Sequence, residues 1–154
     1  MPGNQYDTMS LFHKTPEAAG PLTFTDKESV VALLFLVVTS DGSIDPAEEE
    51  LVIAASNRMQ LLRHQAIPEF NAIVQKVRDA IDGKGRAEVF AAGVKGLPED
   101  LRETVYALAG DIVFADGKAE KGELECLREM QEALQIPDEL ATRVLEVMQI
   151  KNRG

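Results

Sequence analysis

Two clusters of carboxylates, 75 positions apart, are the residues of this chain best suited to bind or activate something. An Asp-Gly pair opens each cluster, and two further acids follow within seven residues. The clusters are Asp41, Asp45 and Glu48, and Asp116, Glu120 and Glu123. Hard divalent cations are held in proteins by oxygen ligands of this kind. The clusters therefore predict a divalent-metal site, with calcium, magnesium or zinc as the ion.

The same residues also permit a purely structural interpretation. Gly42 and Gly117 suit tight turns between helices that need a positive φ. Carboxylates at the start of a helix cap its free N–H groups and interact favourably with the helix dipole. Asp45, Pro46 and Glu48 fit the N-cap, first and third positions of a capping box. Both interpretations stay open at the level of sequence.

Neither cluster completes an EF-hand calcium loop. When the Asp-Gly pair is aligned with the second half of that loop, the two earliest ligand positions hold side chains without carboxylates. These are Val37 and Thr39 in the first cluster, and Ile112 and Phe114 in the second. One loop alone cannot supply the six to eight oxygens that calcium takes. Two loops brought together could hold one shared ion or two weakly bound ions.

The acidic clusters lie inside a longer repeat. Residues 27–50 align with residues 102–125 without a gap, and nine of the 24 aligned pairs are identical. Two copies of one segment are expected to fold alike and to pack face to face. Asp111, which replaces Leu36, is the main difference between the copies. It faces either the acidic region or solvent.

Helical periodicity with Gly and Pro punctuation predicts an all-α fold without strands. The predicted helices cover 26–39, 46–62, 68–81, 86–95, 98–115, 121–134 and 137–150. A turn is expected at Asp82-Gly83-Lys84-Gly85. The first and fifth helices are apolar on nearly every side, so we expect them to lie together at the centre.

Length and composition indicate one soluble domain. We expect a flexible N-terminal arm over 1–25 and a helical domain over 26–150, whose copies span 26–62 and 101–134. The chain has 26 acidic and 16 basic residues, for a net charge of −10. This charge argues against a nucleic-acid interface and against docking on an anionic membrane. It favours cations or basic partners.

Other kinds of chemistry find little support. Cys126 is the only cysteine, which excludes an intrachain disulfide, and no histidine is placed to activate it. Carboxylate-bridged di-metal enzymes use Glu-x-x-His pairs, which do not occur here. The longest apolar run, 30–38, is too short to span a membrane, and no leader peptide is visible. These features predict a cytoplasmic protein and argue against a di-metal enzyme.

The second copy, Phe114-Ala115-Asp116-Gly117 through Glu123, resembles the TerB-like family, which is named for tellurite resistance. The first copy departs from the motif by having Thr39-Ser40 before Asp41-Gly42. Together with the repeat and the order of helices, the resemblance covers about 26–150. It implies a compact helical domain with two related halves and an acidic surface for divalent metal.

The resemblance further implies a role in stress-response systems for tellurite and other insults, with partner proteins that are partly assembled at the membrane. It implies no catalysis. It assigns the metal to Asp41, Glu48, Asp116 and Glu123, with Asp45 and Glu120 as additional ligands. The alternative is an interaction module that needs no metal and uses its acidic face to bind a basic partner.

Overall fold

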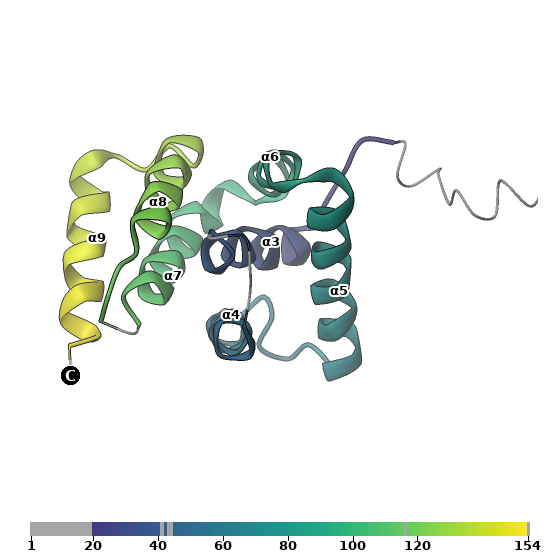
Figure 1. The fold of residues 1–154 in the computed structure, drawn as a ribbon, viewed down its shortest axis with the longest axis horizontal. Helices are drawn as coiled ribbons and strands as arrows, with labels where there is room; N and C mark the ends of the chain where they lie inside the picture. The colour runs from purple at the N-terminus through teal and green to yellow at the C-terminus, as the bar shows by residue number, and fades with distance from the viewer. Residues whose placement is uncertain (1–19, 41, 43–44, 116, 154) are drawn as a thin grey trace, which may run out of the picture.

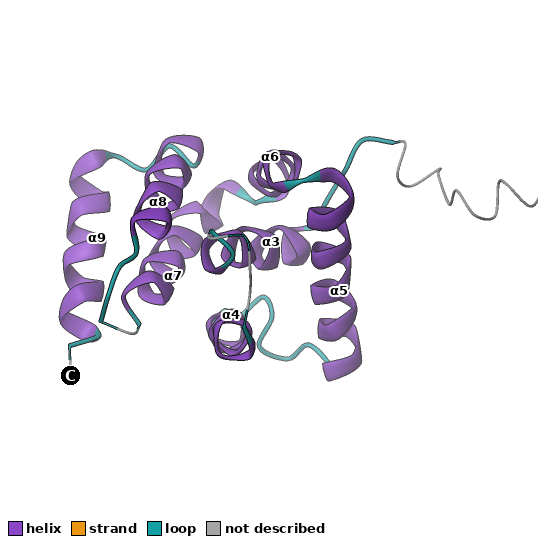
Figure 2. Ribbon diagram, in the orientation of Figure 1, coloured by secondary structure: helices purple, strands orange, loops and turns teal. Residues whose placement is uncertain are grey.

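The computed structural model describes residues 20–40, 42, 45–115 and 117–153. Over these residues the chain forms α-helices and one short 3-10 helix, and no strand (Figures 1 and 2). The helices are α3 (Asp26–Val38), α4 (Pro46–Arg58), α5 (Ile67–Lys84), α6 (Arg86–Gly96), η1 (Glu99–Leu101), α7 (Arg102–Phe114), α8 (Lys121–Ala133) and α9 (Asp138–Lys151). The all-α prediction is confirmed. The predicted arm lies largely outside the described residues.

Helix α3 forms the centre of the molecule, because none of its faces can remain in water. Residues 30–38 are all apolar, and each is at most 3% exposed. Helices α4, α5, α6, α7 and α8 all pack against it (Figure 1). The predicted contact between the first and fifth helices is confirmed as the contact between α3 and α7. Burial of this apolar surface is the main force that assembles the fold.

Two glycines allow α6 to approach α3 closely. A Cβ atom placed on Gly93 would lie 3.0 Å from the side chain of Leu33, and one placed on Gly96 would lie 2.6 Å from the backbone oxygen of Phe24. Larger side chains at these positions would push the two helices apart. The sequence shows α6 as an ordinary helix, and only the structure shows why its glycines are needed.

One difference from the predicted elements is in α5. The expected turn at Asp82-Gly83-Lys84-Gly85 does not form, because the helix continues to Lys84. Gly85 ends it with a φ of +89° and at the same time precedes the first residue of α6. One glycine in a left-handed conformation therefore makes the whole connection. The second predicted helix is shorter than expected, since α4 ends at Arg58.

Corresponding helices of the two sequence copies make corresponding contacts. Helix α3 packs on α4 and α5, and α7 packs on α8 and α9. Lys27 Nζ donates to Gln65 Oε1 at 2.6 Å, and in the other half Arg102 donates to Gln135 Oε1 at 3.1 Å. In each half, a basic residue in the first turn of the inner helix thus binds the glutamine that precedes the third helix. A common origin of the copies stays a prediction.

Candidate functional site

Asp41 and Asp116, the first acid of each predicted metal cluster, lie outside the described residues. The glycines that follow them adopt matching turns. Gly42 and Gly117 have φ values of +91° and +81°. Each donates its N–H to the carbonyl three residues earlier, Thr39 at 2.8 Å and Phe114 at 3.0 Å. Since an L-residue rarely adopts this backbone conformation, the glycine of each Asp-Gly pair has a structural reason.

Asp45 and Glu48 form the capping box that the sequence predicts. The Glu48 N–H donates to Asp45 Oδ1 at 2.8 Å, and the Asp45 N–H donates to Glu48 Oε1 at 3.2 Å. Pro46 takes the first helical position of α4, where its missing N–H costs no hydrogen bond. These two acids therefore stabilise the start of α4, whether or not they have a further role.

Glu120 and Glu123 repeat this arrangement at the start of α8. The Glu120 N–H donates to Glu123 Oε1 at 3.0 Å. All four described members of the acidic clusters thus take part in helix capping. No group of three or more Asp, Glu, His or Cys side chains is placed to hold a metal among the residues that the structure describes. A metal site at these loops would therefore depend on Asp41 and Asp116.

Ser40, which precedes the first acidic cluster, lies beside the first turn of α8. A Cβ atom on Gly122 would lie 3.5 Å from Ser40 Oγ and 3.8 Å from the Ser40 carbonyl oxygen. Ser40 precedes Asp41, and Gly122 precedes Glu123, so the fold brings backbone of the two acidic segments into contact. The sequence predicts this proximity only through the repeat, because the two segments are far apart along the chain.

Two arginines beside the first loop were not singled out by sequence reasoning. Arg86 donates from Nη1 to the Thr39 carbonyl at 2.7 Å and from Nη2 to the Leu36 carbonyl at 2.7 Å. Arg78 forms an ion pair with Glu49. With Gly42, the two arginines line a cavity of about 190 Å³. No local pattern marks either residue, because their partners are distant in sequence.

Asp111 takes neither of the two positions left open by the sequence. Its side chain is only 16% exposed and binds Lys151 Nζ at 3.0 Å and Asn152 Nδ2 at 2.9 Å, with Arg58 at 3.7 Å. Burial alone would raise the pKa of Asp111, but the hydrogen bonds and the charges of Lys151 and Arg58 outweigh it and lower the pKa. Asp111 therefore joins α7 to the ends of α9 and α4.

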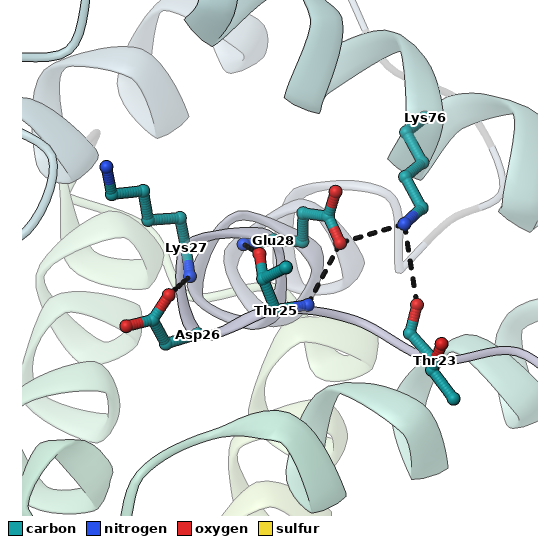
Figure 3. Close-up of polar contacts among 6 residues, drawn as sticks. All are labelled: Thr23, Thr25, Asp26, Lys27, Glu28 and Lys76. Carbon is teal, nitrogen blue, oxygen red and sulfur yellow. Dashed lines mark hydrogen bonds and ion pairs between the residues drawn. The ribbon is translucent and has the colours of Figure 1, made fainter.

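A second polar cluster surrounds the start of α3 (Figure 3). Thr25 and Glu28 form a capping box, and Lys76 Nζ, from α5, donates to Glu28 Oε1 at 2.8 Å. Burial raises the pKa of Glu28, but the bonds from Lys76 and Thr25 outweigh it, so the pKa lies below its ordinary value. The contact between Lys76 and Glu28 links α5 to the start of α3. We therefore assign this cluster a structural role.

The lowered pKa of Glu28 predicts an acid-dependent contribution to stability. Its ionised form is favoured in the folded state, so the contribution is complete above the unfolded-state pKa and is lost as the pH falls through the folded-state pKa. We expect Glu28→Gln to lower the free energy of unfolding by about 1 kcal/mol at neutral pH, with a smaller difference in acid. Urea unfolding at several pH values measures this. Glu88→Gln, an exposed change on α6, is the control, and an equal loss at every pH would contradict the prediction.

Cys126 is buried in α8 and lies 3.8 Å from the Leu36 carbonyl oxygen. Burial raises the pKa of its thiol to about 11. Because the thiolate is the reactive form, we expect alkylation at neutral pH to be on the order of 100-fold slower in the folded chain than in urea. Timed labelling with iodoacetamide and mass spectrometry checks this. Equal rates in the two states would show that the thiol is accessible.

A family model described as tellurite resistance protein TerB matches residues 27–145, which is more than half of the chain. The chain itself matches no curated protein and no solved structure. Within the part of the chain that the structure describes, no helix is both long and apolar enough to cross a membrane. The matched region runs from the first turn of α3 into α9 and includes both acidic loops.

Proposed function

Because the chain belongs to the family of the tellurite resistance protein TerB, we propose that it is a non-catalytic domain of a tellurite-resistance-related stress response. We propose that it acts by binding other stress-response proteins, including members of a membrane-bound assembly. The net charge of −10 supports basic partners or cations over acidic ones.

The distribution of shifted pKa values supports a non-catalytic role. Enzymes concentrate such shifts on acids, bases and nucleophiles in a cleft. Here five groups with shifted pKa values sit in ion pairs or in the core, and none of the five is paired as a nucleophile with a base. They are Glu28, Tyr106, Asp111, Cys126 and Arg128. The family match over residues 27–145 carries the proposal that the domain binds and does not catalyse, and the placement of these groups supports it.

We further propose that the two acidic loops together bind a divalent cation weakly. The contact between Ser40 and Gly122 supports this, because it places one acidic segment beside the other. The capping roles do not exclude it, since a carboxylate has more acceptor capacity than one cap uses. Asp41, Asp45, Glu48, Asp116, Glu120 and Glu123 would supply the oxygens. A bound ion would neutralise charge and fix the loops, which would shape a surface for partners.

Calorimetric titration with calcium, magnesium and zinc tests the metal proposal. We expect saturable binding with a Kd on the order of 10⁻⁴ to 10⁻³ M, as for weak oxygen sites. Asp41→Asn combined with Asp116→Asn should abolish it. Asp100→Asn combined with Glu139→Gln removes two exposed charges elsewhere and is the matched control. If the loop variant binds metal as well as the control variant does, the proposal is wrong.

Metal-independent binding of a basic partner through the acidic face is the second candidate. The net charge of −10 favours it, and a further observation weighs against a metal ion at the first loop. The guanidinium groups of Arg78 and Arg86 line the cavity beside Gly42, and positive charges close to a loop oppose cation binding there. A wild-type chain that takes up no ion in the titration would favour this candidate.

A further inference from the structure

One face of α7 is less buried than the same face of α3. Between positions 29 and 39, burial differs between the two copies only at five aligned pairs. In each pair the α3 residue is buried and the α7 residue is half-buried or exposed. The pairs are Ser29/Thr104, Ala32/Ala107, Leu33/Leu108, Leu36/Asp111 and Thr39/Phe114. Their spacing of three and four places them on one side of a helix. We call Thr104, Ala107, Leu108, Asp111 and Phe114 the α7 stripe.

Helix α6 accounts for the burial of this face on α3. A Cβ atom on Gly93 would meet Leu33 and the Ser29 carbonyl, and one on Gly96 would meet Ser29 Oγ. At the other end of α6, the guanidinium of Arg86 binds the carbonyls of Leu36 and Thr39. Four of the five α3 positions are thus in direct contact with α6.

No helix takes the corresponding position on α7 within the described residues. The principal neighbours of α7 are α3, α4, α8, α9 and the short η1 segment. The end of α9 reaches the α7 stripe at Asp111, which Lys151 and Asn152 bind. Thr104 stays exposed, and Leu108 is only partly buried.

We propose that a basic, amphipathic helix of a partner protein docks on the α7 stripe, in the position that α6 takes on α3. This inference rests on the proposed role in partner binding and gives the partner's chemistry. At the two positions that meet the α6 glycines, the stripe has Thr104 and Leu108, which match Ser29 and Leu33 in kind. Between them, Ala107 matches Ala32. A helix with small residues at the crossing therefore fits both faces.

Charge selects a basic helix and disfavours a second copy of this chain. The carbonyl end of α7 corresponds to the end of α3 where Arg86 binds, so a basic residue at the N-terminal end of the docked helix meets backbone acceptors there. The Asp111 carboxylate, which replaces Leu36, is already bound by Lys151, Asn152 and Arg58. Two copies of a chain with a net charge of −10 repel each other. A helix that carries positive charge around an apolar face has the complementary pattern.

A peptide with the α6 sequence, residues 85–97, is the probe for this site. It is titrated into the ¹⁵N-labelled full chain in EDTA, so that metal binding plays no part and a failure leaves the metal proposal untouched. We expect saturable shifts of the Thr104, Ala107 and Leu108 amide signals. Thr104→Arg, at an exposed position that tolerates the change, should weaken binding at least about tenfold by adding bulk and like charge. Leu108→Glu should do the same.

The control is Ile67→Arg, which introduces the same charge at an apolar residue of α5 that is 76% exposed. It should leave peptide binding unchanged. The proposal is overturned if the peptide does not bind, or if Thr104→Arg binds it as well as Ile67→Arg does. The second result would also arise if the peptide displaced α6 from α3. Shifts of the α7 stripe that depend on protein concentration alone would assign this face to a second copy and would equally overturn the proposal.

Discussion

Replacing Gly96 by alanine is expected to lower the free energy of unfolding by about 3 kcal/mol, the upper part of the range for overpacked cores. The new methyl group would lie 2.6 Å from the Phe24 carbonyl oxygen and even closer to Ser29 Oγ. Ser29 is fully buried and Phe24 contributes backbone, so neither can move aside cheaply. Helix α6 would have to shift away from α3 and open the central contact.

Gly83→Ala provides the matched control, because Gly83 lies near the end of α5 with no atom within 4 Å of the added methyl. Alanine has the better helix propensity, so this variant should be unchanged or more stable by up to about 1 kcal/mol. Urea unfolding followed by circular dichroism compares the two variants. If both change stability by the same amount, the close approach of α6 to α3 does not matter energetically.

Arg86→Met is expected to cost about 2 to 3 kcal/mol, which is large for a residue that is half-buried. The guanidinium satisfies the Leu36 and Thr39 carbonyls and Thr39 Oγ1 at 2.6–2.7 Å. Leu36 is 2% exposed and Thr39 is 8% exposed. Water therefore cannot easily replace the lost donors. The Thr39 carbonyl would keep the Gly42 N–H, but the buried Leu36 carbonyl would keep only the weak contact of the Cys126 thiol, which is costly. The positive charge at the end of α3 is lost as well.

Arg78→Met is the control for this prediction. Arg78 pairs with Glu49, and both side chains are about one third exposed, so its removal should cost less than about 1 kcal/mol. Arg86→Lys should be intermediate, since one ammonium cannot reach both carbonyls with the geometry of a guanidinium. Equal stability of the Arg86→Met and Arg78→Met variants would refute the assigned role of Arg86.

Local features of this fold were predictable because their causes are local. The capping box of Asp45 and Glu48 depends on residues three positions apart, and the sequence shows it directly. The central place of α3 follows from an apolar stretch that no single neighbour can cover. The continuation of α5 through Gly83 was missed, because packing of the preceding turns outweighs the weak helix propensity of one glycine.

The candidate site was predictable only in part, for a related reason. The sequence shows which acids recur, and the structure shows that the four described acids cap helices. It could not show that Ser40 lies against Gly122, or that Arg86 binds the end of α3. Both contacts join segments that only the tertiary fold brings together. Asp111 could not be placed either, because its partners come from α4 and α9.

The burial of α3 on every side has a consequence for how the chain acquires its structure. Isolated, this helix would expose only apolar surface beyond its first two turns, and contact with only some of its neighbours would leave part of that apolar surface in water. The two halves are therefore expected to fold together, not one after the other. During synthesis, the last apolar faces of α3 become buried only after α7 and α8, which lie far along the chain, have been made.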